Sequence, residues 1–294
     1  MTSRILLAVA CLALTSCATT QNGQEPEPEV VAAAQEDLPR GEGESIDEHL
    51  FVPEPVELLE PVIVETGDQP KFYANVWARV VDDFALPNCY DHESARAWAN
   101  WYADHQEYMA RVMKRAQPWI YFIAEELEAR DLPGELALLP VVESAYDPFA
   151  YSSGRALGTW QFISSTGKHY GLRQDWWYDG RRDVWSSTYA ALDYLEYLRD
   201  KFDGDWLLAL AGYNSGENRV ARRVKRNQAK GKPADFWNIS LPKETKGYVP
   251  KLLGLACLFQ NPSSYGYELP VAANLPVITA VEMESQSDLV LISQ

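Results

Sequence analysis

Apolar residues at helical spacing run through this chain from about residue 117 to residue 260, and strand-like alternation is missing from that stretch. Ile120, Ile123, Ala124 and Leu127 are spaced by three and four residues, as on the buried face of an α-helix. Similar spacing predicts further helices at 135–143, 184–202, 206–213, 217–230 and 243–260. Such a pattern buries its apolar surface by packing helix on helix. We therefore predict an all-α domain over residues 117–262.

Shorter stretches before this domain also have helical spacing. Val76, Val80 and Phe84 mark the first, and Ala97 to Val112 marks a second amphipathic helix after the break at 86–88. We predict that residues 71–116 form N-terminal accessory helices that pack on the domain. Residues 263–294 are then a C-terminal extension.

The first 16 residues have the pattern of an export signal. Arg4 supplies the positive charge, and Ile5 to Leu14 is an apolar core too short to span a bilayer as a helix. Leu14-Thr15-Ser16-Cys17 resembles a bacterial lipobox, in which the signal is cut before a cysteine that then carries lipid. We predict a lipoprotein signal peptide at 1–16 and lipidation of Cys17. The alternative is an ordinary cleaved signal with a chance cysteine.

Residues 17–70 are acidic and rich in proline and glutamate. Between residues 25 and 65 there are 13 Asp or Glu against one Arg, which gives −12 of the chain's net charge of −16. Such a segment buries too little apolar surface to offset its ordering entropy, so we predict a disordered acidic tether. The tether could space a lipid-held domain from the membrane, or it could be a linker without a role; the two interpretations do not exclude each other. The negative charge also argues against nucleic acid as a partner.

The motifs of metal and nucleotide sites are missing from the sequence. The four histidines form no ligand pattern, and there is no CxxC, HExxH, GxGxxG or Walker loop. We therefore predict no metal and no cofactor. Cys89 and Cys257 would reach an oxidising compartment after export, but the sequence leaves open whether they pair.

One carboxylate stands out by its neighbours. The apolar run from Leu136 to Val142 leads to Glu143, and small and polar residues follow up to Gly158. A glutamate beside apolar surface is partly desolvated, which raises the pKa of its carboxyl group and suits it to be a general acid near neutral pH. The alternative is a helix end whose Glu143 points into water.

A second carboxylate that could act together with Glu143 is hard to identify in the sequence. Asp147 is near Glu143, but Asp147-Pro148 is typical of a turn. Asp179 and Asp183 lie among Arg181 and Arg182, which predicts structural ion pairs that brace a loop.

Four short motifs follow one another along the domain: Glu143-Ser144, Gly158-Thr159-Trp160-Gln161, Tyr213-Asn214-Ser215-Gly216 and Glu244-Thr245-Lys246-Gly247-Tyr248. Together they resemble the goose-lysozyme-like (SLT) catalytic domain of the lytic transglycosylases, in particular the membrane-bound type D group. The resemblance covers about residues 117–267. It implies a lysozyme-like helical fold and non-hydrolytic cleavage of the β-1,4 bond between N-acetylmuramic acid and N-acetylglucosamine in peptidoglycan, leaving 1,6-anhydromuramic acid ends.

The resemblance also assigns roles to single residues. Glu143 matches the family's catalytic glutamate, which acts first as acid and then as base. Tyr213 is a candidate hydrogen-bond donor to Glu143 or to the sugar, and Ser144 orients the acid or caps a helix. Core packing is the alternative for the tyrosines. The positions that the resemblance assigns to substrate binding are Ser144, Ser152, Gln161, Tyr213, Asn214 and Tyr248.

Two other functions stay open. A muramidase on the same fold would use water in place of the muramic acid O6, and a silent peptidoglycan-binding or scaffold lipoprotein would not cleave at all. The partners we expect are peptidoglycan glycan strands and, through the lipid, a membrane; protein partners stay unknown. Ala18 rather than Asp follows Cys17, which by resemblance to enterobacterial sorting favours the outer membrane of a Gram-negative-type envelope, facing the periplasm.

Two further features of the sequence are not explained by cleavage of peptidoglycan. Relatives of this type often carry C-terminal LysM modules, and residues 263–294 do not resemble one. Residues 219–232 carry seven Lys or Arg without an acidic residue between them. They could meet the carboxylates of peptidoglycan stem peptides, form a solvated face, or contact the acidic tether.

Overall fold

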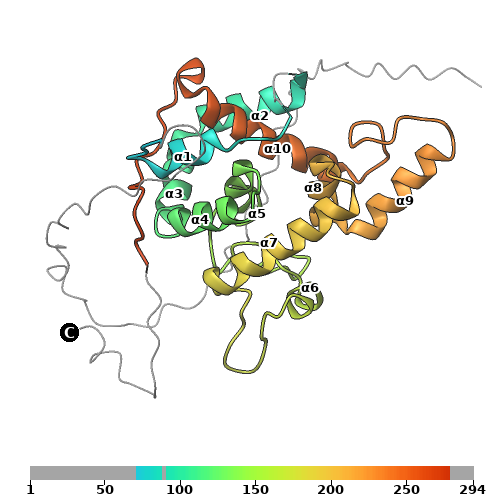
Figure 1. Ribbon diagram of the computed structural model, residues 1–294, viewed down its shortest axis with the longest axis horizontal. Helices are drawn as coiled ribbons and strands as arrows, with labels where there is room; N and C mark the ends of the chain where they lie inside the picture. The colour runs from blue at the N-terminus through green and yellow to red at the C-terminus, as the bar shows by residue number, and fades with distance from the viewer. Residues whose placement is uncertain (1–70, 88–90, 279–294) are drawn as a thin grey trace, which may run out of the picture. The chain divides into compact units, whose positions relative to one another are not determined.

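The computed structural model describes residues 71–87 and 91–278, which fold into helices (Figure 1). The α-helices are α1 (Val76–Asp82), α2 (Glu93–Asp104), α3 (Gln106–Ala116), α4 (Ile120–Ala129), α5 (Leu139–Ser144), α6 (Ser164–His169), α7 (Val184–Lys201), α8 (Trp206–Ser215), α9 (Glu217–Gln228) and α10 (Lys243–Gln260); η2 (Gly134–Leu138) and η3 (Pro262–Tyr265) are 3-10 helices. Among residues 71–87 and 91–278, β-pairing is limited to isolated bridges. The predicted all-α class is confirmed.

Several expected features lie outside the described residues: the signal peptide, the lipidated Cys17, the acidic tether and Cys89. Cys257 in α10 is disulfide-bonded. Within 71–87 and 91–278, no helix combines the length and the hydrophobicity needed to cross a membrane.

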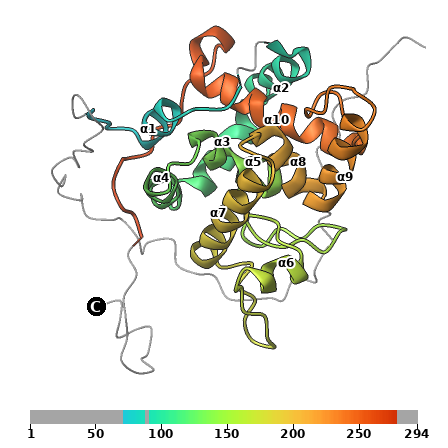
Figure 2. The ribbon, with the colours of Figure 1, turned by 45° about the vertical axis from the view of Figure 1, so that its right-hand side comes forward.

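One hydrophobic core joins the helices before residue 117 to those after it. α10 packs along α2 and also contacts α5, α8 and η2, while α7 packs on α8. Figures 1 and 2 both show the short helix α5 enclosed among longer helices. Leu136 and Leu138, which precede α5, and Leu139, its first residue, have no exposed surface. The apolar run before Glu143 therefore anchors α5 in the core.

The first and last described segments lie together. The Asn75 side chain accepts a hydrogen bond from the Trp77 backbone N–H and caps α1. The same side chain donates to the carbonyl of Pro270 (3.0 Å), and the Val76 N–H donates to the carbonyl of Ala272 (2.9 Å). Part of the C-terminal extension thus closes against the start of the accessory helices.

Two helix predictions need correction. The helix expected through Ala97 to Val112 is two helices, α2 and α3, which meet at His105. The His105 ring stacks on Trp101 (centroids 4.0 Å apart), and its Nδ1 lies 2.6 Å from the Trp101 carbonyl oxygen, so the side chain competes for the helix's own acceptor.

The helix expected from Glu135 onward is also divided. Its first turn is the 3-10 helix η2, and α5 follows it. Pro140 therefore lies in the first turn of α5, where its missing N–H breaks no helical hydrogen bond. The result is a change of helix type rather than a kink.

Candidate active site

Glu143 lies in the last turn of α5, which ends in two left-handed residues. Ala145 has φ 52° and Tyr146 has φ 58°, a backbone region that non-glycine residues seldom occupy and that costs on the order of 1 kcal/mol or more for each residue. The fully buried Tyr146 donates its hydroxyl to the Ala137 carbonyl (2.5 Å) and holds this turn. The backbone beyond Glu143 is therefore fixed by the core.

A tyrosine of α10 donates a hydrogen bond to Glu143. The donor is the hydroxyl of Tyr248, and the acceptor is Oε1 of Glu143. Tyr213, the tyrosine expected to donate to Glu143 or to the sugar, instead donates to the backbone carbonyl of Trp160 (2.8 Å). Of the two tyrosines, Tyr248 is thus the direct partner of the acid.

The surroundings of Glu143 raise the pKa of its carboxyl group from 4.5 to about 7. The largest cause is burial, which removes water from the charged form. The hydrogen bond from Tyr248 lowers the pKa, the charge of Glu244 raises it, and the charge of Lys251 lowers it. The residue as a whole is partly exposed. Near neutral pH, Glu143 therefore populates both its acid and its carboxylate form.

Two charged residues near the acid, Glu244 and Lys251, were not predicted from the sequence to belong to the site. Glu244, Tyr248 and Lys251 are spaced by four and three residues along α10, which places them on one face of the helix. The ammonium of Lys251 lies over the ring of Trp98, 4.8 Å from its centroid, and burial lowers its pKa. Tyr248 belongs to a recognised motif, and Glu244 and Lys251 lie four residues before it and three after it on the same helix. This spacing was the signal in the sequence that could have identified both charged residues.

Glu135 is the carboxylate most easily confused with Glu143, because burial raises its pKa as well. Glu135 is only 2% exposed, and its two oxygens accept the backbone N–H groups of Ala85 and Leu86 (3.0 and 2.8 Å). Its oxygens are therefore engaged in hydrogen bonds that stabilise the fold, and its burial keeps substrate away from it. Glu143, partly exposed and bound through one oxygen, is the residue that can do chemistry.

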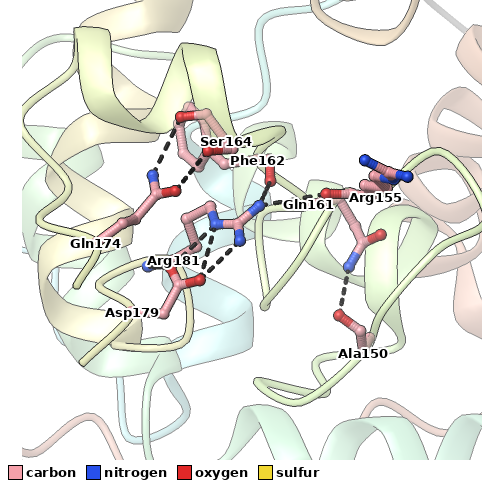
Figure 3. Close-up of polar contacts among 8 residues, drawn as sticks. All are labelled: Ala150, Arg155, Gln161, Phe162, Ser164, Gln174, Asp179 and Arg181. Atoms are coloured by element: carbon pink, nitrogen blue, oxygen red, sulfur yellow. Dashed lines mark hydrogen bonds and ion pairs between the residues drawn. The ribbon is translucent and has the colours of Figure 1, made fainter. Parts of the chain in front are cut away.

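The loop from residue 150 to residue 162 is held by side chains at its own turns (Figure 3). Gln161, with φ 50°, donates through Nε2 to the carbonyls of Ala150 (3.1 Å) and Gly158 (2.8 Å). Gly158 has φ 86°, and a Cβ atom there would lie 1.8 Å from the carbonyl oxygen of Arg181. Only glycine fits this close approach.

Arg181 connects this loop to the segment before α7. Its guanidinium donates to the carbonyls of Arg155 and Phe162 (3.2 Å each) and pairs with Asp179 (2.7 Å), as Figure 3 shows. Arg181 is only 9% exposed. The carboxylate of Asp179 therefore compensates a buried cation, and its pKa is lowered mainly by the hydrogen bond from Arg181. The predicted ion pair is confirmed for Asp179.

Three helices also hold the loop. Ser144 at the end of α5 donates to the Thr159 carbonyl (2.8 Å), the indole of Trp160 donates to Thr188 of α7 (2.9 Å), and Tyr213 of α8 donates to the Trp160 carbonyl. The loop is thereby fixed directly beside the turn that carries Glu143. Ser144 joins α5 to this loop rather than contacting the acid's carboxylate.

The remaining predicted residues have more local contacts. The hydroxyl oxygen of Ser152 accepts the backbone N–H of Ala156 (3.0 Å), so it stabilises a turn of the loop. Asn214 follows Tyr213 in the last turn of α8 and is partly exposed. Across residues 71–87 and 91–278, no three His, Cys, Asp or Glu side chains are grouped to hold a metal ion.

The aspartates weighed as a second carboxylate are all engaged. Asp147 accepts the backbone N–H of Phe149 (2.9 Å) and lies 3.7 Å from the guanidinium of Arg115. Asp183 caps α7 through the N–H of Ser186 and accepts the hydroxyl of Tyr178 (2.7 Å), so it is a helix cap rather than a partner of arginine. These contacts favour structural roles.

Comparison with known proteins gives a family match. Residues 120–236 match the model of the Transglycosylase SLT domain. This range contains Glu143, the 150–162 loop and Tyr213, whereas Tyr248 lies beyond it.

Individual relatives match over longer ranges. The chain is 44% identical over 225 residues to membrane-bound lytic murein transglycosylase D of Escherichia coli K12. The matched region covers 74% of this chain and 50% of that protein. It is 36% identical over 170 residues to a putative tributyltin chloride resistance protein of an Alteromonas species, covering 58% of this chain and 80% of the relative. A putative soluble lytic murein transglycosylase of Haemophilus influenzae is 32% identical over 137 residues, 43% of this chain and 23% of the relative. The chain thus spans about half the length of the first of these relatives.

Proposed function

Because this chain belongs to the family of transglycosylase SLT-domain proteins, we propose that it is a peptidoglycan lytic transglycosylase. It cleaves the β-1,4 bond between N-acetylmuramic acid and N-acetylglucosamine and leaves a 1,6-anhydromuramic acid end. The observation that carries this proposal is the state of Glu143, a partly exposed residue whose carboxyl group has a pKa of about 7 and accepts a tyrosine hydroxyl on one of its oxygens.

The reaction uses Glu143 twice. Its acid form donates a proton to the glycosidic oxygen, the bond from that oxygen to C1 of the muramic acid breaks, and positive charge develops at C1. The resulting carboxylate then takes the proton of the muramic acid O6, and O6 bonds to C1. The proton given in the first step is recovered in the second, and no water is consumed.

The environment of Glu143 suits this double role. A residue that must be an acid and then a base works best when its pKa lies near the working pH. Burial favours the acid form before cleavage, while Tyr248 and Lys251 favour the carboxylate that follows. The left-handed turn at Ala145 and Tyr146 fixes the backbone, so the carboxyl group keeps its position through both steps.

We propose that the mature protein is held at the membrane by lipid on Cys17 and faces the peptidoglycan from the outer membrane. The lipobox-like sequence at residues 14–17 supports this, as does the membrane-bound relative from E. coli. Several acyl chains would hold the protein firmly, because each buried methylene contributes about 0.8 kcal/mol.

The deciding experiment is mass spectrometry of soluble products from purified sacculi digested by residues 18–294. We expect muropeptides one water lighter than hydrolytic products, and none from the Glu143→Gln variant. Products with reducing ends would identify a muramidase and direct attention to Glu244 as the base that activates water. An absence of products from folded wild-type protein would favour the non-catalytic scaffold.

A further inference from the structure

A strongly basic surface follows the site along the chain. Between Asn218 and Ala234 there are seven cations and no acid. Most of this segment is α9, in which Val220 is the one buried residue. The cations are Arg219, Arg222, Arg223, Lys225, Arg226, Lys230 and Lys232, and we call this surface the basic ridge.

The cations of the basic ridge lack the acidic partners that several core arginines of the described residues have. Arg79, Arg130 and Arg181 each pair with carboxylates. Among the ion pairs of residues 71–87 and 91–278, none involves a cation of the ridge. The dipole of α9 favours cations at its C-terminal end, which accounts for Lys225 and Arg226 but not for cations along the first turns.

Spacing along α9 aligns several guanidinium groups. Arg219, Arg222 and Arg226 are separated by three and four residues and are all exposed, so they form one stripe on the outer face of the helix. Each of these three guanidinium groups can bind one carboxylate through two parallel hydrogen bonds, because its planar fork matches the geometry of a carboxylate.

The ridge begins at the edge of the candidate active site. Tyr213 and Asn214 lie in the last turn of α8, and Gly216, with φ 88°, turns the chain directly into α9. Glu217 at the start of α9 accepts the hydroxyl of Tyr194 (3.1 Å) and lies 3.6 Å from Lys201, so its charge is compensated. From there α9 extends away from α8 (Figures 1 and 2) over a length of about 18 Å.

We propose that the basic ridge binds the stem-peptide carboxylates of the same peptidoglycan strand that Glu143 cleaves. This inference rests on the proposed function. A polymer whose sugars occupy the site carries its acidic peptides past the adjoining surface, and α9 is a cationic surface continuous with the site. Charge complementarity and this continuity favour stem peptides over anionic lipid or the chain's own acidic segment.

The test measures binding separately from cleavage. The Glu143→Gln protein, residues 18–294, is sedimented with intact sacculi and with glycan strands whose peptides an amidase has removed. The ridge variant adds Arg219→Gln, Arg222→Gln and Arg226→Gln. The control variant removes three exposed cations elsewhere, through Arg111→Gln, Lys114→Gln and Lys168→Gln.

We expect the ridge variant to bind peptide-bearing sacculi about tenfold more weakly and peptide-free strands as well as its parent does. The control variant should bind both polymers like the parent. Binding of the parent to sacculi should also weaken as salt rises from 0.05 to 0.3 M, because screening shortens the range of exposed charges.

Four results would overturn the proposal. Equal loss on both polymers, or equal loss in the control variant, would mean non-specific attraction. Unchanged binding by the ridge variant would mean a solvated helix face. Loss of binding to phosphatidylglycerol vesicles but not to sacculi would identify lipid as the occupant. Because all binding is measured with the Glu143→Gln variant, these outcomes are independent of whether wild-type protein yields anhydro products.

Discussion

The hydroxyl of Tyr248 donates a hydrogen bond to Oε1 of Glu143, which joins α10 to the last turn of α5 across 105 residues of sequence. The pKa of Tyr248 is raised well above its usual value, mainly by burial, so the phenol remains a donor at every working pH. A donor that cannot ionise stabilises the carboxylate form of Glu143 without competing for its proton. This hydrogen bond lowers the pKa of Glu143, whereas burial raises it.

The first prediction concerns that hydrogen bond. Removing a hydrogen bond to a charged group costs about 1.5–3 kcal/mol, so Tyr248→Phe should raise the pKa of Glu143 by about one unit or more. The fall of kcat/KM on the alkaline side should move to higher pH by the same amount. At its own optimum the variant should be about tenfold slower or more, because the carboxyl group is held less firmly. A pH–rate profile on sacculi measures both effects.

Tyr213→Phe is the matched control, since its hydroxyl contacts the Trp160 carbonyl and not the acid. This variant should lose activity through a looser loop while its alkaline limb stays within a few tenths of a unit of wild type. If Tyr213→Phe moves the limb as far as Tyr248→Phe does, the assignment of Tyr248 as the direct partner is wrong.

The second prediction uses the two charges on the same face of α10. Glu244→Gln removes a charge that raises the pKa of Glu143, so the pKa should fall. Lys251→Met removes a charge that lowers it, so the pKa should rise. Each change should be several tenths of a unit to about one unit, as for a partly screened charge. Carbon-13 NMR titration of the Glu143 carboxyl group measures both; shifts of the same sign would mean that burial, not charge, has changed.

The third prediction links the acid to stability. The carboxyl group of Glu143 has a pKa of about 7 in the folded chain against 4.5 for an unperturbed glutamate. The folded state therefore holds this proton more tightly, and the stabilisation is full below about pH 4.5 and is lost as pH rises through about 7. Glu143→Gln cannot ionise. Relative to wild type, its free energy of unfolding should be higher at pH 8 than at pH 5, by at most about 3 kcal/mol.

Urea unfolding of both proteins at the two pH values measures this difference. The comparison at pH 5 is its own control for packing changes, because in the folded state both side chains are largely neutral there. An equal difference in free energy at pH 5 and pH 8 would show that Glu143 does not titrate in this range.

The fourth prediction concerns the turn at Gly158 in the loop from residue 150 to residue 162. Gly158 and Gly171 both have positive φ, 86° and 80°, so alanine strains the backbone at either position. An added Cβ at Gly158 lies 1.8 Å from the Arg181 carbonyl oxygen, whereas at Gly171 it meets nothing within 4 Å. Gly171→Ala should cost about 1 kcal/mol, the backbone strain alone. Gly158→Ala should cost more than about 3 kcal/mol, because a fixed backbone atom must move.

The midpoints of urea unfolding test this pair, and activity on sacculi adds a second measurement. Gly171→Ala should keep its activity, while Gly158→Ala should lose most of it even under conditions where the protein is folded, because the loop beside Glu143 is displaced. Equal costs at the two positions would mean that strain and not the contact with Arg181 fixes this turn.

Much of the fold followed from local properties of the sequence. The predicted helix at 243–260 is α10, Lys243–Gln260, and the helix at 184–202 differs from α7 by one residue at its end. Apolar spacing and capping act over a few residues, so they can be found without knowing the fold. The division of the predicted helix at His105 was missed, because it depends on where one ring packs.

The candidate acid was also evident from the sequence. Its apolar run and its motif selected Glu143, and the structure gives that residue a desolvated carboxyl group with a raised pKa. The sequence could not separate this property from that of Glu135, since burial raises both pKa values. The two glutamates differ in their hydrogen-bond partners. Both oxygens of Glu135 accept backbone N–H groups from a distant part of the chain, Ala85 and Leu86.

Only the tertiary structure decided which partners the acid has. Tyr213 and Tyr248 both belong to motifs, yet Tyr248 reaches Glu143 while Tyr213 holds the loop at Trp160. Helix spacing fixes which face of α10 carries Glu244, Tyr248 and Lys251, but the packing of α10 against α5 decides what that face meets. Local sequence sets the direction of a side chain within its helix, whereas contacts across 105 residues depend on how every intervening helix packs.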